Sequence, residues 1–388
     1  MPRLVFFGFP ARGHTAPSLA VVAELVRRGV AVDYFSTPPF QALVEEAGAC
    51  FVAYPAACES LSRPLDLDEH LVRGLEVTLQ LMPALCAALE RRPDLVLFDA
   101  SALWGGILAR RLGLPSVASI TTFAFNRSML RMLGLSEQGV PRGWSPATLA
   151  QLNETYGAGL RDHLDLLVPA ADLSLVYTSR EFQPAGKHFD ASHLFLGPLL
   201  DRRPRDGART LAGDTRPLAY VSLGTIFNRD PALLMRIGEV LAARGWQVVV
   251  SLGDAAASVA QRCPDHVQVH AFVDQVGVLA KARLFVTHGG MNSVSEALSQ
   301  GVPMIVIPQG VDQHLVAKQA ARHGAAIVID PGALSMESLD AAAARIGQEH
   351  AAFTAAAARL RDTFATATPV ETAVDAVLAL VTRERADA

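Results

Sequence analysis

The stretch RLFVTHGGMNSVSEALSQGVPMIVIP, residues 283–308, contains two short apolar runs separated by a segment with a helical pattern. The first run ends at His288 and two glycines, and the second ends at Pro308. A continuous apolar run predicts a strand buried on both faces, and a helix between two such strands is typical of a parallel sheet. This stretch therefore predicts a strand–helix–strand unit of an α/β protein.

The same alternation fills the rest of the chain. Strands are predicted by RLVFFGF (3–9), VAVDYFS (30–36), DLVLFD (94–99), SLVYTS (174–179), LAYVSLG (218–224), WQVVVSLG (246–253) and VQVHAF (267–272). Residues 201–217 are charged, rich in Pro and Gly and without periodicity, which indicates a linker. We expect two Rossmann-like domains, 1–200 and 218–388, with parallel sheets facing across a cleft. The sequence does not say on which domain a last helix, at about 370–383, packs.

Composition limits the classes of function. A chain of 388 residues, 51% of them hydrophobic, suits two domains of ordinary size. A net charge of -4 without a basic tract gives no reason to expect nucleic acid as a partner. The cysteines lack CxxC or metal-ligand spacing, which favours a reducing compartment. The N-terminal segment does not read as a signal peptide, and no apolar run is long enough to span a bilayer. We expect a cytoplasmic protein without stable membrane association.

The residues after the run at 283–287 are suited to an anion. Gly289 and Gly290 permit close backbone approach, and Asn292 and Ser293 are residue types that favour a helix start. Unpaired N–H groups and the helix dipole at such a start attract phosphate, to which His288 could donate a further hydrogen bond. The alternative is an ordinary capped helix with a satisfied histidine. No GxGxxG follows a strand, which weakens a nicotinamide or flavin interpretation.

Carboxylate and amide groups lie near this candidate phosphate site. Glu296 is one turn further along the same helix, where it could accept hydrogen bonds from ribose hydroxyls. Asp312 and Gln313 follow the next apolar strand, and an acid–amide pair can bind several sugar hydroxyls. The alternative for that pair is an exposed helix start with Asp312 as its cap.

The segment 272–319, with its motif HGGMNS, resembles the donor-binding signature of UDP-dependent glycosyltransferases of the GT-B fold, and most of all the bacterial macrolide, polyketide and flavonoid glycosyltransferases. The resemblance covers essentially the whole chain. It implies uracil stacking on Phe272 and pairing with the backbone of Val273. By the same resemblance, Gln275 and Glu296 hold the ribose. The remaining donor contacts that it implies are His288, Gly290, Asn292, Ser293 and Thr225 at the diphosphate, and Asp312 and Gln313 at the sugar.

In the first half, His14 follows the first strand and precedes a helix that we expect to begin near Pro17. A loop histidine that caps its own helix is the alternative explanation. The resemblance implies that His14 is the general base, and that Asp99, at the end of the strand 94–99, orients it. A carboxylate holds such an imidazole in one tautomer. Asp99 could instead cap the helix that follows.

These residues imply an inverting transfer of a hexose, with UDP-glucose as the expected donor and a small hydrophobic hydroxylated molecule as the acceptor. The helix start can stabilise the leaving diphosphate, so we expect no metal and no cofactor. Asp66 and Asp68 have the DxD spacing of metal-dependent transferases, but they precede a helix in the irregular segment 56–89, where a solvated helix start is the simpler interpretation. The segments 56–89 and 123–167 could line an acceptor pocket or be ordinary core. A dTDP-deoxysugar transferase and a non-catalytic nucleotide-sugar-binding relative remain alternatives.

Overall fold

The computed structural model describes residues 2–62, 66–89, 92–134, 139–200, 215–224, 230–253, 256, 266–310 and 312–387. The chain forms two compact units, Met1–Leu199 with Ala367–Ala388, and Leu200–Thr366. Residues 201–214 of the expected linker lie outside the described residues. The second unit ends at Thr366 and not at residue 388, because helix α14 (Val370–Asp387) packs against α1 (Arg12–Arg27) of the first unit.

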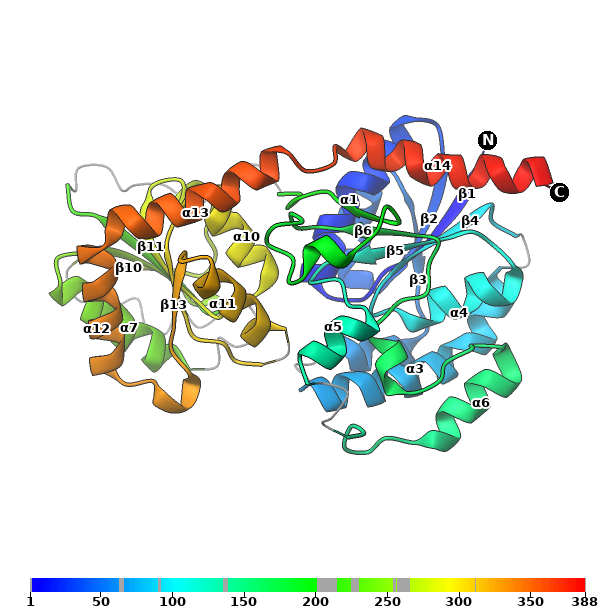
Figure 1. Ribbon diagram of the computed structural model, residues 1–388, viewed down its shortest axis with the longest axis horizontal. Coiled ribbons are helices and arrows are strands. Elements are labelled where there is room, and N and C mark those ends of the chain that lie inside the picture. The colour runs from blue at the N-terminus through cyan, green and yellow to red at the C-terminus, as the bar shows by residue number, and fades with distance from the viewer. Residues whose placement is uncertain are drawn as a thin grey trace. The chain divides into compact units, whose positions relative to one another are not determined.

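The first unit is built on a parallel seven-stranded sheet with the order β3-β2-β1-β4-β5-β6-β7 (Figure 1). Its strands are β1 (Arg3–Phe7), β2 (Ala31–Ser36), β3 (Cys50–Ala53), β4 (Leu95–Asp99), β5 (Ser116–Ile120), β6 (Leu173–Val176) and β7 (His193–Phe195). The direction of winding reverses between β1 and β4, which pair in parallel through Phe7 and Phe98. In open sheets of this kind, ligands bind at the carboxyl ends of the strands beside that reversal.

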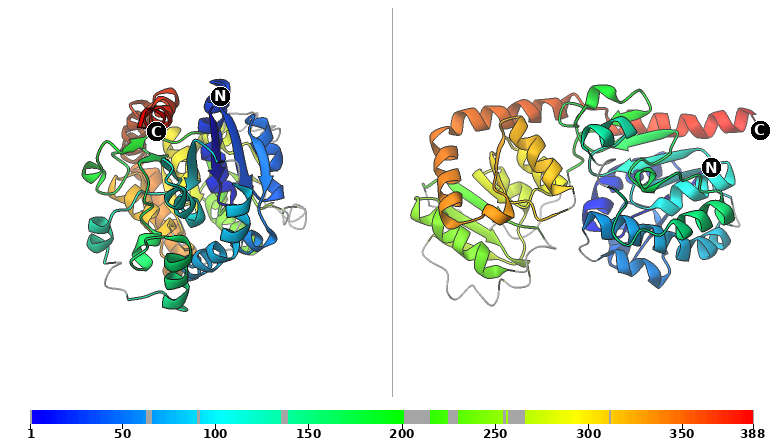
Figure 2. Two further views of the ribbon diagram at one scale, coloured as in Figure 1. Left: turned by 90° about the vertical axis from the view of Figure 1, so that its right-hand side faces the viewer. Right: turned by 60° about the horizontal axis from the view of Figure 1, so that its bottom comes forward.

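Helices cover both faces of this sheet (Figures 1 and 2). α1 and α14 share an apolar core with one face, in which Leu25, Val374 and Val377 are buried beside Leu4 and Phe6. α4 lies on the opposite face, so closely that a Cβ on Gly105 would lie 2.3 Å from the Cβ of Phe98. The helices of the unit are α1, α2 (Gln41–Glu46), α3 (Leu67–Ala88), α4 (Leu103–Leu112), α5 (Arg127–Met132), α6 (Pro146–Tyr156) and α14, with 3-10 turns η1 (Pro38–Phe40), η2 (Ala56–Ser62), η3 (His163–Leu166) and η4 (Gly186–His188).

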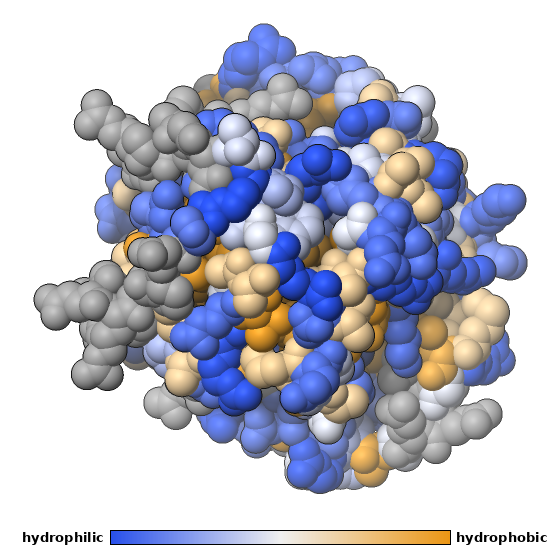
Figure 3. Space-filling model, turned by 90° about the vertical axis from the view of Figure 1, so that its left-hand side faces the viewer, coloured by the Kyte–Doolittle hydropathy of each residue, from blue (hydrophilic) through white to orange (hydrophobic). Residues whose placement is uncertain are grey.

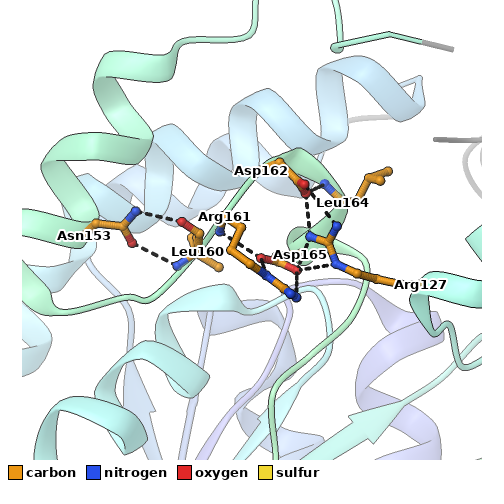
Figure 4. A network of polar contacts seen from close by, with 7 residues as sticks. All are labelled: Arg127, Asn153, Leu160, Arg161, Asp162, Leu164 and Asp165. Atoms are coloured by element: carbon orange, nitrogen blue, oxygen red, sulfur yellow. Dashed lines mark hydrogen bonds and ion pairs between the residues drawn. The ribbon is translucent and has the colours of Figure 1, made fainter. Parts of the chain in front are cut away.

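A polar network fixes the irregular chain between α6 and β6 (Figure 4). The guanidinium of Arg127, in α5, donates to Asp162 at 2.8 Å and to Asp165 at 2.5 Å. Arg161 also donates to Asp165, at 2.8 Å, and the amide of Asn153 exchanges hydrogen bonds with the backbone of Leu160. Burial raises the pKa of Asp165, but the hydrogen bonds from the two arginines outweigh it and hold that pKa at about 2. This network attaches η3 to α5 through charge-assisted hydrogen bonds.

The second unit repeats the plan with six parallel strands in the order β10-β9-β8-β11-β12-β13. α7 and α12 share an apolar core with one face of the sheet, and α10, α11 and α13 lie on the other (Figure 1). The strands are β8 (Leu218–Ser222), β9 (Gln247–Ser251), β10 (Val267–His270), β11 (Ala282–Thr287), β12 (Met304–Val306) and β13 (Ala326–Val328). The helices are α7 (Pro231–Ala243), α9 (Gln275–Leu279), α10 (Met291–Ser299), α11 (Gln313–Arg322), α12 (Met336–Gln348), α13 (His350–Ala365) and η7 (Pro331–Ala333).

The surface drawn in Figure 3 is mostly hydrophilic, with small apolar areas between charged side chains. In the described parts of the chain, the exposed large apolar side chains are Met132, Leu133, Val140 and Phe272. Three of the four lie at or beyond the end of α5, in the predicted acceptor region.

Within the described residues, α3 is the single helix long and apolar enough to cross a membrane, and α13 with α14 meets the same criteria if the bent pair is counted as one span. Core helices of soluble proteins meet these criteria too. α3 buries Leu71, Leu75 and Leu81, which is the behaviour of a core helix.

Candidate active site

His14 lies in the first turn of α1, the helix that follows β1. The helix begins at Arg12, about five residues earlier than the sequence predicted, and Pro17 lies inside it. Its N-cap, Ala11, makes no side-chain cap, so no capping residue marked this start in the sequence. Gly8 at the end of β1 has no room for a side chain, since a Cβ there would lie 2.6 Å from the ring of Tyr34.

His14 and Asp99 are in contact. Nδ1 of His14 lies 3.0 Å from each carboxylate oxygen of Asp99, the last residue of β4. The side chain of Asp99 is 2% exposed and that of His14 is 22% exposed, so the pair is buried on the carboxylate side and open on the imidazole side. The backbone N–H of Ser101 donates to Asp99 at 2.8 Å, and Thr121 Oγ1 lies 3.1 Å from the same Nδ1. These contacts hold the ring with Nδ1 toward the carboxylate.

A mainly apolar hollow, open to solvent, is lined by residues next in the chain to this pair and to its neighbour Thr121. Its lining includes Ala100 and Ser101, which directly follow Asp99, and Ile120, which directly precedes Thr121. Most of the rest comes from the segments 56–89 and 123–167, including Leu71, Phe123 and Leu166, while Leu103, Thr122 and Pro169 lie outside both segments. The two irregular segments singled out in the sequence thus meet at one pocket. Met82 and Met129, by contrast, are buried core side chains.

In the second unit, His288 directly follows β11 and is separated from the first residue of α10 by Gly289 and Gly290. The N-cap of that helix is Gly290, so Asn292 and Ser293 are in its first turn and do not cap it. First-turn N–H groups have no acceptor within the helix and are available to an anion, so the phosphate-binding argument survives this correction. Burial lowers the pKa of His288 to about 4, which keeps its imidazole neutral near pH 7.

Two glycines shape the space around His288. A Cβ on Gly224, after β8, would lie 2.7 Å from Cε1 of His288, and a Cβ on Gly290 would lie 2.6 Å from its Nε2. Gly224 also has φ of +82°, a conformation that other residues rarely adopt. The importance of Gly224 was missed in the sequence. The available signal was that it ends the strand LAYVSLG, and β8 proves to be the immediate neighbour of β11.

The two residues predicted to hold the ribose are in direct contact with one another. Nε2 of Gln275 donates to Glu296 at 2.6 Å and lies 3.2 Å from Ser293 Oγ, while the hydroxyl of Tyr220 donates to Oε1 of Gln275 at 3.1 Å. The amide is therefore fixed between a buried tyrosine and α10. Phe272, the predicted stacking residue, is 65% exposed and three positions before Gln275, and Val273 is half-buried beside it.

The two residues of the predicted sugar-binding pair, Asp312 and Gln313, have different environments in the structure. Gln313, the first residue of α11, is buried, and its Oε1 accepts from the backbone N–H of Gln309 at 2.8 Å. Its amide nitrogen can donate to a sugar, while its oxygen keeps one lone pair beyond this bond. Asp312 is the N-cap of α11 but its side chain makes no cap hydrogen bond. Thr225, the remaining predicted donor contact, lies outside the described residues.

The DxD carboxylates have structural partners. Asp66 caps α3 and accepts from the N–H of Glu69 at 2.8 Å, in a reciprocal capping box. Asp66 and Asp68 both pair with Arg142, at 2.5 and 3.3 Å. Among the described residues, no group of three or more His, Cys, Asp or Glu side chains is arranged to hold a metal ion.

Known proteins with this sequence pattern share an activity. Residues 231–380 match the family described as erythromycin biosynthesis protein CIII-like, C-terminal domain. The chain is 30% identical over 354 residues to the NDP-glycosyltransferase YjiC of Bacillus licheniformis, with 87% of each protein covered. It is also 31% identical to the demethyllactenocin mycarosyltransferase of Streptomyces fradiae, over 89% of this chain and 79% of the relative. The chain belongs to the nucleotide-sugar glycosyltransferases of the macrolide and antibiotic type.

The fold of this glycosyltransferase agrees with that assignment. The crystal structure of the glycotransferase of kitacinnamycin superposes with a TM-score of 0.86 at 31% identity, covering 98% of this chain and 100% of the other. The two parallel-sheet units confirm the GT-B class predicted from the sequence.

Proposed function

We propose that this glycosyltransferase is an inverting, metal-independent enzyme that transfers glucose from UDP-glucose to a hydroxyl of a small hydrophobic molecule in the cytoplasm. Acceptors of this class are macrolides, polyketides, flavonoids and other phenols. The observation that carries the proposal is the contact between His14 Nδ1 and both oxygens of Asp99, each at 3.0 Å. His14 is the general base in this proposal, and Asp99 orients it.

The contact determines which nitrogen can act. A carboxylate accepts hydrogen bonds, so the neutral imidazole carries its proton on Nδ1 and leaves the lone pair on Nε2. Nε2 takes the proton from the acceptor hydroxyl as the oxygen attacks the anomeric carbon. Asp99 then stabilises the imidazolium that forms, as in other His–Asp pairs. A single displacement on the face opposite the leaving group inverts the anomeric centre, so an α-linked donor gives a β-glycoside.

Departure of the nucleotide requires stabilisation of a growing negative charge. The first turn of α10 offers N–H groups at the positive end of the helix dipole, and the neutral His288 offers a further donor. Donors fixed before the reaction stabilise such charge without reorganising. The carboxylates of Asp66 and Asp68 are already engaged by Arg142 and by the start of α3, which supports a metal-independent reaction.

The lining of the hollow near His14 supports the proposed acceptor class. Its walls are mainly apolar, with isolated polar groups, which suits a molecule with an apolar body and few hydroxyls. The identity of the individual acceptor depends on the shape of this pocket and not on the His14–Asp99 pair.

A dTDP-deoxysugar is the second candidate donor. Gln313 supports it, because one lone pair of its carbonyl oxygen is already bound by the backbone N–H of Gln309, which leaves less acceptor capacity for sugar hydroxyls. The demethyllactenocin mycarosyltransferase of Streptomyces fradiae, at 31% identity, is a relative named for a different sugar. Turnover of UDP-glucose against dTDP-sugars, with one phenolic acceptor and mass-spectrometric detection, separates the two candidates. The Gln313→Ala variant should reduce hexose use more than it reduces binding of free UDP.

The test of the mechanism is His14→Ala. Removing the base should reduce turnover by at least about a hundredfold while UDP binds with nearly unchanged affinity. Asp99→Asn should also reduce turnover, because the amide can orient the ring in the wrong tautomer. Turnover by His14→Ala at the wild-type rate would refute the assignment of the base, and loss of activity in a chelator would refute metal independence. A product with retained anomeric configuration in the NMR spectrum would refute single displacement.

A further inference from the structure

A second histidine, His70, lines the same hollow as the residues that follow Asp99. It lies in the first turns of α3, where its backbone N–H bonds to the carbonyl of Asp66 at 2.9 Å. Its ring packs against Phe9 with the centroids 5.5 Å apart, and the ring of His14 packs against the same phenyl group at 4.8 Å. Two imidazoles thus share one aromatic neighbour, and one of them, His70, lines the apolar pocket.

The side chain of His70 is available to a ligand. It is half-buried, and within the described part of the chain it has no hydrogen-bond partner in the protein. Burial lowers the pKa of His70 to about 4. The nearby His14 also lowers this pKa, and its effect is larger than the opposite effect of the Asp99 charge. A neutral imidazole has one N–H donor and one acceptor nitrogen. A desolvated ring with unused donor and acceptor atoms gains most from a polar ligand group, because an apolar one leaves those atoms unsatisfied.

The pocket has few other polar side chains for such a ligand. Ser101 and Thr122 contribute hydroxyls, while Leu71, Leu103 and Phe123 provide apolar walls. For an acceptor that enters this pocket, His70 is the imidazole among the residues that line it.

We propose that His70 binds a second oxygen atom of the acceptor, on the same ring as the hydroxyl that receives the sugar, and so selects aromatic acceptors with neighbouring oxygen substituents. This inference rests on the proposed function, since it takes His14 as the residue at the reacting hydroxyl. His70 acts in recognition and takes no proton in the reaction.

Two probes of nearly equal size test this selection, naphthalene-2,3-diol and 2-naphthol. Their dissociation constants are measured by calorimetry on the full chain saturated with UDP and without sugar donor. A neutral hydrogen bond predicts that the wild type prefers the diol by roughly two- to tenfold. His70→Phe, which retains the aromatic contact with Phe9, should bind both probes equally. His70→Gln, which retains a donor and an acceptor, should restore part of the preference.

His163→Phe is the matched control. His163 is a half-buried histidine of the same unit that packs on Trp144, with the ring centroids 5.7 Å apart, and it does not line the hollow. Its replacement should leave the preference unchanged. In steady-state transfer to the diol, His70→Phe should raise KM and leave kcat near the wild-type value, as expected for recognition without proton transfer.

The outcomes separate this inference from the proposed function. A wild type with no preference between the probes, or a His70→Phe variant that keeps the preference, overturns the role of His70 even if sugar transfer occurs. A preference that is present in the wild type and lost in His70→Phe supports the role, even if neither probe receives a sugar and the proposed reaction fails. A fall in kcat with unchanged KM assigns His70 to the chemical step and overturns a role in recognition.

Discussion

The space around His288 provides a sharp test of the candidate nucleotide site. We consider Gly224→Ala, in which the new methyl group would lie 2.7 Å from Cε1 and 2.8 Å from Nε2 of His288. These distances are shorter than real Cβ contacts allow, so the imidazole must move. The φ of +82° at Gly224 adds a backbone cost of about 1–2 kcal/mol for any residue with a side chain.

A matched variant separates these two effects. Gly245, after α7 in the same unit, also has φ of +82°, but a Cβ there would meet nothing within 4 Å. Gly245→Ala therefore carries the backbone cost alone, the same about 1–2 kcal/mol in the free energy of unfolding. Gly290→Ala is the converse, because its φ of -61° is unstrained while its Cβ would lie 2.6 Å from Nε2 of His288.

The expected result follows from the role proposed for His288. A hydrogen bond to a charged phosphate contributes about 1.5–3 kcal/mol, so displacing the imidazole should weaken UDP binding by roughly ten- to a hundredfold. Calorimetry should show this loss in Gly224→Ala and Gly290→Ala and wild-type affinity in Gly245→Ala, while urea unfolding reports the backbone cost in all three. If Gly224→Ala binds UDP as tightly as Gly245→Ala does, the position of His288 is irrelevant to the nucleotide and the phosphate site is wrong.

Two further predictions concern stability. Arg127→Ala leaves the largely buried Asp165 with Arg161 as its remaining charged partner, and it should lower the free energy of unfolding by about 1–3 kcal/mol, measured by urea titration. Arg142→Ala, which breaks an exposed ion pair, should lower the free energy of unfolding by less than about 1 kcal/mol. An equal loss of stability in both variants would contradict the expected difference between the buried and the exposed ion pair. Burial lowers the pKa of His288 to about 4, so the unfolded chain binds a proton at this imidazole more readily than the folded chain does. The contribution of the neutral His288 to the free energy of unfolding is therefore complete above about pH 6.5 and is lost as the pH falls toward 4. His288→Gln should remove up to about 3 kcal/mol of that pH dependence, and an unchanged slope between pH 6.5 and 4 would show that the imidazole is not desolvated.

The sequence was most informative where burial is complete. Every strand predicted from a continuous apolar run is present, because strands covered on both faces must be apolar along their whole length. The strands that it did not reveal are β3, β5, β7 and β13. β5 reads SVASI, whose serines are buried and bonded to other side chains, and β13 has only three residues. Neither pattern differs from that of a loop.

The starts of the helices at the site were predicted less well, for a common reason. The N-caps of α1 and α10 are Ala11 and Gly290, and neither makes a side-chain cap. Neither N-cap position holds a Ser, Thr, Asp or Asn residue that would identify the helix start, and a histidine of the candidate site, His14 or His288, lies close to each start. Local sequence rules fail where a site requires bare backbone or an open first turn. The contact between His14 and Asp99 was expected from the family resemblance, and it agrees with the position of both residues after or at the end of strands at the carboxyl edge of a parallel sheet.

The topology explains why a histidine occurs at equivalent positions of the two units. His14 follows β1 and His288 follows β11, and each lies beside the point at which the winding of its sheet reverses, between β1 and β4 or between β8 and β11. The strand adjacent to β1 ends in a carboxylate, Asp99, whereas the strand adjacent to β11 is followed by Gly224. A carboxylate stabilises a protonated imidazole, so His14 is suited to accept a proton. His288, packed between glycines and desolvated, stays neutral and is suited to donate a hydrogen bond to an anion. The neighbouring strand end, more than the histidine itself, thus determines the chemistry of each site.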